Sequence, residues 1–203
     1  MGATTTRELY LETGLAVLAD SGYSALKLSE VCNRLGVTSG SFYHFFKNWS
    51  DYTNQLIEHW LASRTQVEVA AARAEPDPLR RMVDLIEFAV LLPHDAEAAI
   101  RTWAAMDPDV GKVQEAADRS RYDVVFDIAM ELLDDRVAAH RYSSWANFVL
   151  TGYEQTTLPE DREALRWAAE QFITSLADAA RDRREGQVVT TDGRTQTPVD
   201  VRD

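Results

Sequence analysis

The chain has 203 residues, 45% of them hydrophobic, and a formal net charge of −12. That length allows one or two domains with a buried core, and the single cysteine, Cys32, excludes an internal disulfide. The acidic balance argues against a general nucleic-acid coat, because phosphate binding draws on Lys and Arg. No apolar run is long enough to cross a bilayer, and acidic residues among residues 1–20 argue against a signal peptide. We therefore expect a protein of the reducing cytoplasm.

The first predicted helix begins at Thr5-Thr6-Arg7-Glu8, which has the pattern of a capping box. Apolar residues then recur at helical spacing up to Leu18 and predict a face that packs on the core. Gly14 lies within this face and has two interpretations. It permits close packing of another helix, or it only costs about 1 kcal/mol of helix propensity.

Residues 27–46 predict two short helices joined by a tight turn. Gly36 suits the left-handed conformation that commonly ends a helix. The Thr38 hydroxyl is expected to cap a second helix that runs from Ser39 to about residue 45. This helix would bury Phe42 and leave a face of small residues and hydrogen-bond donors. Such spacing is typical of a helix-turn-helix unit, whose second helix enters the major groove of DNA.

Residues 7–58 resemble the DNA-binding domain of the tetracycline-repressor (TetR) family of one-component regulators. The residues that carry the resemblance follow in matching order and spacing: Arg7, Leu11, Leu15, Leu18, Gly22, Tyr23, Val31, Gly36, Val37, Gly40, Phe42, Tyr43, His44, Phe46 and Asp51. The resemblance implies a DNA-binding domain over residues 1–63, with the helix-turn-helix motif at 27–46. Leu26 and Trp49 depart from the family, which commonly has a hydroxyl and a lysine at these positions.

Eight residues are the predicted DNA contacts: Lys27, Thr38, Ser39, Gly40, Ser41, Tyr43, His44 and Lys47. We expect Tyr43 and Lys47 to contact phosphate, and the serines with His44 to lie at or near base edges. Two neighbouring aromatic residues leave alternatives open. Phe45 either touches a thymine methyl or packs on its own domain, and Trp49 either donates to a phosphate or fills space in the core.

Helices alone are predicted from residue 51 to residue 184. A long helix over 51–73 ends at the break Glu75-Pro76-Asp77-Pro78. Helices follow over 77–91, 94–106, 109–134 and 137–155, and a last one starts at Pro159 and frays past Arg181. The predicted fold class is all-α with about nine helices. Residues 185–203 are predicted to be a polar tail, flexible despite the hairpin signal at Asp192-Gly193.

The resemblance further implies that residues 64–184 bind a small ligand and form a homodimer. The eighth and ninth predicted helices, 137–155 and 159–181, would pair across a two-fold axis. Large side chains suited to an apolar or aromatic ligand are the predicted pocket residues, although each has the alternative of being plain core: Phe88, Trp103, Tyr122, Phe126, Met130, Trp145 and Phe148.

The sequence lacks a phosphate-binding loop, a nucleophile elbow and a metal-spaced cluster of His and Cys. We therefore expect no enzyme, no cofactor and no metal. The favoured hypothesis is a repressor that binds a palindromic double-stranded DNA operator as a dimer and is released by a ligand. The alternative is an all-helical binding or scaffold protein with a degenerate DNA-reading face, which the net charge and the departures at Leu26 and Trp49 suggest.

Overall fold

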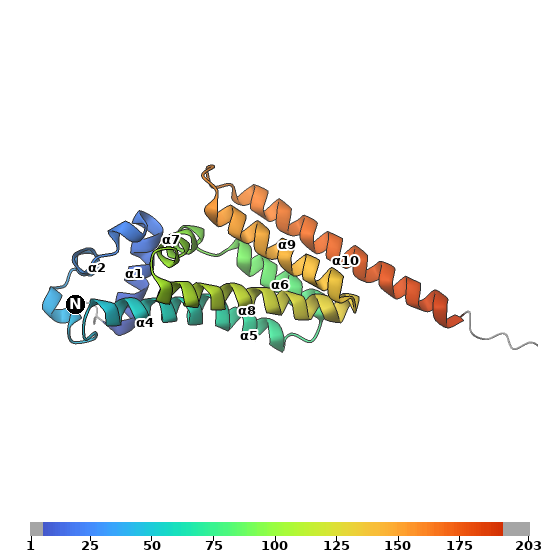
Figure 1. The fold of residues 1–203 in the computed structure, drawn as a ribbon, viewed down its shortest axis with the longest axis horizontal. Helices are drawn as coiled ribbons and strands as arrows, with labels where there is room; N and C mark the ends of the chain where they lie inside the picture. The colour runs from blue at the N-terminus through green and yellow to red at the C-terminus, as the bar shows by residue number, and fades with distance from the viewer. Residues whose placement is uncertain (1–5, 193–203) are drawn as a thin grey trace, which may run out of the picture.

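The computed structural model describes residues 6–192, and over that range the chain is helical throughout, without a strand. Figure 1 shows an elongated molecule, with α1 and α2 at one end and the long helices α8, α9 and α10 running away from it. The elements of the amino-terminal end are α1 (Arg7–Ser21), the 3₁₀ turn η1 (Tyr23–Ala25), α2 (Leu28–Leu35), α3 (Ser39–Phe42) and α4 (Trp49–Leu61). The predicted all-α fold class is confirmed.

Helix α4 continues without a break through the π-helical turn η2 (Ala62–Gln66) into α5 (Val67–Ala74). Together they form one rod over residues 49–74, close to the single helix predicted over 51–73. The rod ends where Glu75 becomes extended. Asp77 then caps α6 (Pro78–Val90) by accepting from the Arg80 N–H at 2.9 Å. The predicted break at 75–78 is thus present, because proline cannot continue a helix but suits its first turn.

The remaining elements are α7 (His94–Ala104), α8 (Pro108–Leu133), α9 (Arg136–Gln155) and α10 (Arg162–Asp192). If α4, η2 and α5 count as one rod, the described residues form nine helices, as expected. No helix among the described residues combines the length and the apolarity that a membrane span needs.

The last helix is longer than predicted. We expected fraying past Arg181 and a polar tail over 185–203, but α10 continues to Asp192. The Arg183 side chain ties this part of α10 to the end of α8, donating to the Leu132 carbonyl at 3.1 Å and to the Asp134 carboxylate at 2.7 Å. Residues 185–192, which we assigned to the polar tail, therefore belong to α10. Residues 193–203 of the tail, like Thr5 of the predicted capping box, lie outside the described residues.

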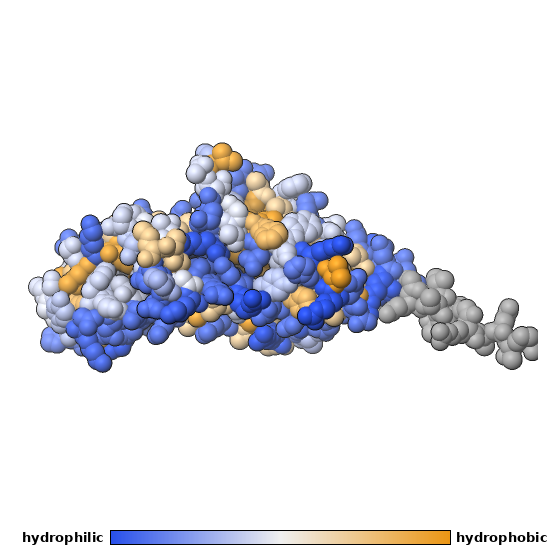
Figure 2. All heavy atoms as spheres, viewed as in Figure 1, coloured by the Kyte–Doolittle hydropathy of each residue, from blue (hydrophilic) through white to orange (hydrophobic). Residues whose placement is uncertain are grey.

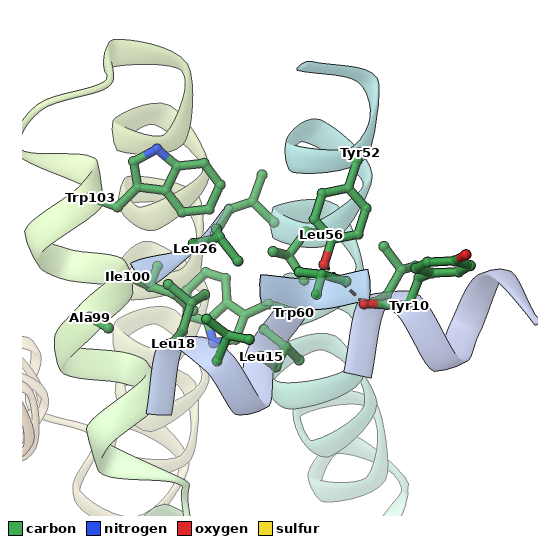
Figure 3. Packing of buried hydrophobic residues seen from close by; sticks show 14 of the residues in the cluster. Tyr10, Leu15, Leu18, Leu26, Tyr52, Leu56, Trp60, Ala99, Ile100 and Trp103 are labelled. Carbon is green, nitrogen blue, oxygen red and sulfur yellow. Dashed lines mark hydrogen bonds between the residues drawn. The ribbon is translucent and has the colours of Figure 1, made fainter. Parts of the chain in front are cut away.

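Two clusters of buried apolar side chains hold the molecule together. The first joins α1 to α4 with α7 and the start of α8, and Figure 3 shows Ile100 and Trp103 of α7 facing Leu18 and Leu26 within it. The Trp103 ring stacks on Tyr23, with centroids 5.1 Å apart. The second cluster joins α5, α6, α8, α9 and α10. Helix α7 lies after the predicted domain boundary at 63/64, yet its side chains belong to the first cluster. It therefore packs the second predicted domain against the first.

Gly14 is required by a close approach between α1 and α4. A Cβ at this position would lie 2.1 Å from the Tyr52 hydroxyl oxygen and 3.0 Å from a Leu56 methyl. The Tyr52 hydroxyl donates to the Tyr10 carbonyl at 2.9 Å, the dashed line in Figure 3. Of the two interpretations of Gly14, close packing is therefore the one that the structure supports.

Candidate functional site

The turn between α2 and α3 sets the direction of the candidate recognition helix. Gly36 is left-handed (φ 64°, ψ 32°), and the Val37 N–H closes the end of α2 on the Cys32 carbonyl at 3.0 Å. Thr38 stands at the N-cap of α3, but its hydroxyl makes no capping bond, contrary to our expectation. Its backbone carbonyl accepts from the Ser41 N–H instead, at 3.0 Å.

Helix α3 is also shorter than the predicted span of 39–45. It ends at Phe42, and the following residues make bonds to the third residue back, from His44 to the Ser41 carbonyl and from Phe45 to the Phe42 carbonyl. Such bonds are typical of a tightened last turn. The chain therefore turns away from α3 at Tyr43–Phe46 rather than extending the helix.

Aromatic packing fixes α3 against the core. Phe42 and Phe46 are fully buried, and both rings meet Tyr10 of α1 edge to face, at 5.8 and 5.7 Å between centroids. Phe45 is half-buried with its ring 5.4 Å from Tyr10. Trp49 is half-buried, and its ring lies tilted against Tyr52 with the centroids 4.9 Å apart. Of the alternatives left open for Phe45 and Trp49, the structure supports packing on their own domain.

The eight predicted DNA contacts lie on the surface of this end of the molecule. Seven of them are exposed and Ser41 is half-buried, and Tyr43 is 57% exposed. Within the described residues, none of their side chains makes a hydrogen bond or an ion pair. Lys27 and Lys47 are the cations of this set, whereas Arg34 is engaged by Asp20 at 2.5 Å and by Glu30 at 2.8 Å. A polar surface without internal partners is open to an external one.

A network that the sequence reasoning missed fixes the segment after α3. Arg7 donates to the Phe45 carbonyl at 2.9 Å and to the Gln55 side chain at 2.6 Å, and Gln55 donates to Asp51 at 2.9 Å. Asp51 also accepts from the Lys47 N–H at 2.8 Å, and these bonds hold the pKa of the Asp51 carboxyl below its ordinary value. The i, i+4 spacing of Asp51 and Gln55 was the one available signal.

A cavity of about 70 Å³ lies between η2, α5, α6, α8 and α9. Two of the seven predicted pocket residues, Phe88 and Tyr122, line it. Its other walls are mostly apolar, with a few polar groups: Arg64, Thr65, Glu68, Val69, Leu85, Ile86, Ala89, Leu92, Arg121, Val125, Ser143, Ala146, Asn147 and Leu150.

The other five predicted pocket residues lie elsewhere. Trp103 belongs to the amino-terminal core. Phe126 and Met130 pack against the second cluster. Trp145 and Phe148 are 36% and 75% exposed. We predicted pocket residues from the size of their side chains. The rotation of α9 about its axis decides instead which of its residues reach the cavity, and Trp145 and Phe148 lie roughly opposite the lining face.

Polar bonds connect the cavity wall to the end of the molecule that carries α3. Glu97 of α7 is fully buried, accepting from the Trp60 indole N–H at 2.7 Å and from Arg121 at 2.9 Å. Arg121 also donates to the Thr65 hydroxyl at 3.2 Å. Arg64 donates to Glu12 of α1 at 3.2 Å. The sequence had no signal for these pairs, because their members lie far apart in the chain.

A short helix with an exposed polar face, held by a glycine turn against a three-helix core, defines a helix-turn-helix protein. Residues 11–49 match the family model described as "Bacterial regulatory proteins, tetR family". The transcriptional regulator AcuR of Cereibacter sphaeroides is 36% identical over 56 residues, which are 28% of this chain and 26% of that protein. The match thus spans about a quarter of the curated relative's length. The predicted resemblance to the TetR family is confirmed.

Solved structures share the fold over most of the chain. A TetR transcription regulator from Haloarcula marismortui aligns with a TM-score of 0.69 and 16% identity, covering 85% of this chain and 96% of that one. The transcriptional regulator FadR from Bacillus subtilis, solved in complex with stearoyl-CoA, aligns with a TM-score of 0.62 and 13% identity, covering 86% and 99%. At these identities the likeness shows a common fold.

Proposed function

We propose that the chain is a transcriptional repressor that binds a palindromic double-stranded DNA operator as a homodimer and is released by a small ligand. The observation that carries the proposal is the exposed, internally unbonded polar face of α3 and its flanks. The match to a family of regulatory proteins supports it and favours a non-catalytic role. The site of action would be the cytoplasm, where a bacterial operator lies.

Direct DNA contacts are proposed at the eight surface residues around α3. The Tyr43 hydroxyl and the Lys47 ammonium would contact phosphate and fix the register, and Ser39, Ser41 and His44 would lie at or near base edges. Because residues 1–63 hold four Lys and Arg against six Asp and Glu, we expect modest non-specific affinity. Specific affinity would come from hydroxyl donors as well as from charge.

The two proposed phosphate contacts are expected to contribute differently to the affinity for DNA. Lys47→Gln should weaken binding to the DNA upstream of the chain's own coding sequence and reduce the salt slope of log K by about 1 per protomer. Tyr43→Phe should weaken binding about 3- to 10-fold, the loss of one hydrogen bond. Gel shifts over a series of salt concentrations measure both effects.

Lys112→Gln is the matched control for Lys47→Gln, because Lys112 is an exposed cation on α8. Its affinity and salt slope should equal those of the parent. Unchanged affinity in Tyr43→Phe would remove that hydroxyl from the interface. If the parent protein does not bind DNA at low salt, the proposal that the chain is a transcriptional repressor is overturned. That result would support the alternative, a scaffold protein with a degenerate DNA-reading face.

The proposed dimer contact is the outer face of α9 together with α10. Val137, Arg141, Trp145 and Phe148 are exposed and spaced by four, four and three residues, so they share one face of α9. Trp167 of α10 is 63% exposed. Figure 2 shows apolar residues interrupting the polar surface where α9 and α10 lie in Figure 1. A large exposed apolar surface is typical of an interface.

Phe148→Glu is expected to convert the dimer to a monomer, because it places a charge in an apolar contact that occurs twice across the two-fold axis. Light scattering after gel filtration gives the mass directly. Met106→Glu is the control, since Met106 is also exposed, at 61%, but follows α7 rather than lying on α9. A Phe148→Glu protein that remains a dimer would place the contact elsewhere.

Release by ligand would work through two conformers. The rod α4–η2–α5 passes from the first buried cluster to the cavity, and α7 packs within the first cluster. A ligand that prefers one arrangement of these elements shifts the separation of the two α3 helices in the dimer. It can shift the equilibrium only by its difference in affinity for the two conformers, typically about 1–3 kcal/mol.

A further inference from the structure

Two arginine side chains, Arg64 and Arg121, are among the residues that line the cavity, and their donors are incompletely used. Arg121 donates through Nη2 to Glu97 and Thr65, but its buried Nη1 has no acceptor within the described residues. Arg64 donates through Nη2 to Glu12, and its buried Nε likewise has no acceptor there. Buried guanidinium donors are normally satisfied, so this pair is suited to an anionic acceptor.

The rest of the cavity is suited to an apolar body. Val69, Leu85, Ile86, Phe88, Val125 and Leu150 contribute aliphatic and aromatic walls. At about 10–15 Å³ per water-sized group, a volume of about 70 Å³ holds a molecule of about five to seven non-hydrogen atoms. One carboxylate, with two oxygens that accept charge-assisted bonds, would match the two arginines.

We propose that the cavity binds a small monocarboxylate with an apolar chain, and that Arg121 and Arg64 hold its carboxylate. This inference rests on the proposed function and deepens it by stating the chemical class of the effector. Glu68 also lines the cavity and is the opposing charge there. Its carboxylate lowers the affinity for an anion and thereby discriminates against ligands with more than one negative charge.

The same two arginines connect the ligand to the DNA-reading end. Arg64 and Thr65 lie in η2, where the rod leaves α-helical geometry, and such π-helical turns are frequent at functional sites. Arg64 holds Glu12 of α1, and Arg121 holds Glu97 of α7. An anion on the guanidinium groups competes with both carboxylates, so it loosens the Arg64–Glu12 bond, which joins the rod to α1, and the Arg121–Glu97 bond, which joins α8 to α7.

Calorimetric titration of the full chain with sodium butyrate tests the proposal, and butyramide is the uncharged control of equal size. We expect butyrate to bind and butyramide to bind at least about tenfold more weakly. Arg64→Gln should weaken butyrate binding about tenfold, Glu68→Gln should strengthen it several-fold, and Arg73→Gln, at an exposed arginine that does not line the cavity, should leave it unchanged. Arg64 and Glu68 are preferred to Arg121, whose loss would leave Glu97 buried without its cation.

Three results would overturn the inference. They are equal binding of butyrate and butyramide, unchanged butyrate binding in Arg64→Gln, and no binding of butyrate at about 10 mM, a concentration that would reveal a site with a dissociation constant in the millimolar range. Gel shifts on the upstream DNA separate this failure from that of the proposed function. If the chain binds DNA but not butyrate, only the proposed carboxylate site is overturned. If it binds butyrate but not DNA, the proposed regulatory function is overturned and the proposed carboxylate site is retained.

Discussion

Replacing Glu97 with alanine is expected to lower the free energy of unfolding by about 3–5 kcal/mol. Glu97 is fully buried and accepts from both Trp60 and Arg121. Without its carboxylate, the Arg121 charge would remain in the interior without its anion, and the indole N–H of Trp60 would lose its acceptor. Urea unfolding followed by far-ultraviolet circular dichroism gives the change.

Two further variants make the expected loss specific to those bonds. Glu97→Gln keeps a carbonyl acceptor but removes the charge, so its stability should lie between those of the parent and Glu97→Ala. Glu115→Ala removes an exposed carboxylate from α8 and should change stability by less than about 0.5 kcal/mol. A loss below about 1 kcal/mol in Glu97→Ala would show that the buried bonds contribute little.

The second large effect is expected at Gly14. Gly14→Ala should cost about 1–3 kcal/mol of stability, although alanine is the better helix former, because the new methyl meets the Tyr52 hydroxyl at 2.1 Å. Tyr52 has little room to yield, since it is fully buried and bonded to the Tyr10 carbonyl. Thermal unfolding of the variant against the parent measures the loss.

A double-mutant cycle tests the cause. Tyr52→Phe removes the obstructing oxygen and should itself cost about 1 kcal/mol for the lost bond to Tyr10. In that background Gly14→Ala should cost less than in the parent, because only the Leu56 methyl groups at 3.0 and 3.1 Å remain to give way, and the difference is a coupling energy of about 1–2 kcal/mol. Additive losses in the double variant would mean that the hydroxyl is not what excludes a methyl at this position.

The fold was largely predictable because its signals are local. Apolar spacing, proline breaks and the left-handed Gly36 set the helix boundaries to within a few residues over most of the chain. The end of α10 was missed because the bonds of Arg183 to Leu132 and Asp134 span about fifty residues. The short α3 was missed because the Arg7–Phe45 bond, which holds the chain turned away, joins two elements distant in sequence.

The surface around α3 could be predicted, whereas the cavity could not. A helix-turn-helix unit fixes which residues of its second helix face outward, and those residues are exposed apart from the half-buried Ser41. The cavity depends on the rotation of each long helix about its axis. The side of α9 that lines the cavity consists of Ser143, Ala146, Asn147 and Leu150. The larger side chains Trp145 and Phe148 lie on the opposite side of the helix and are exposed.

The position of α7 determines where this chain can be joined to a part of another protein. A graft that takes residues 1–74 from this chain and a helical bundle from another would carry the surface around α3 without Ile100 and Trp103. Those two side chains pack in the same cluster as Leu18, Leu26 and Tyr23. The unit that can be exchanged with another protein therefore includes α7 and the first turns of α8, and a graft has to be cut after them.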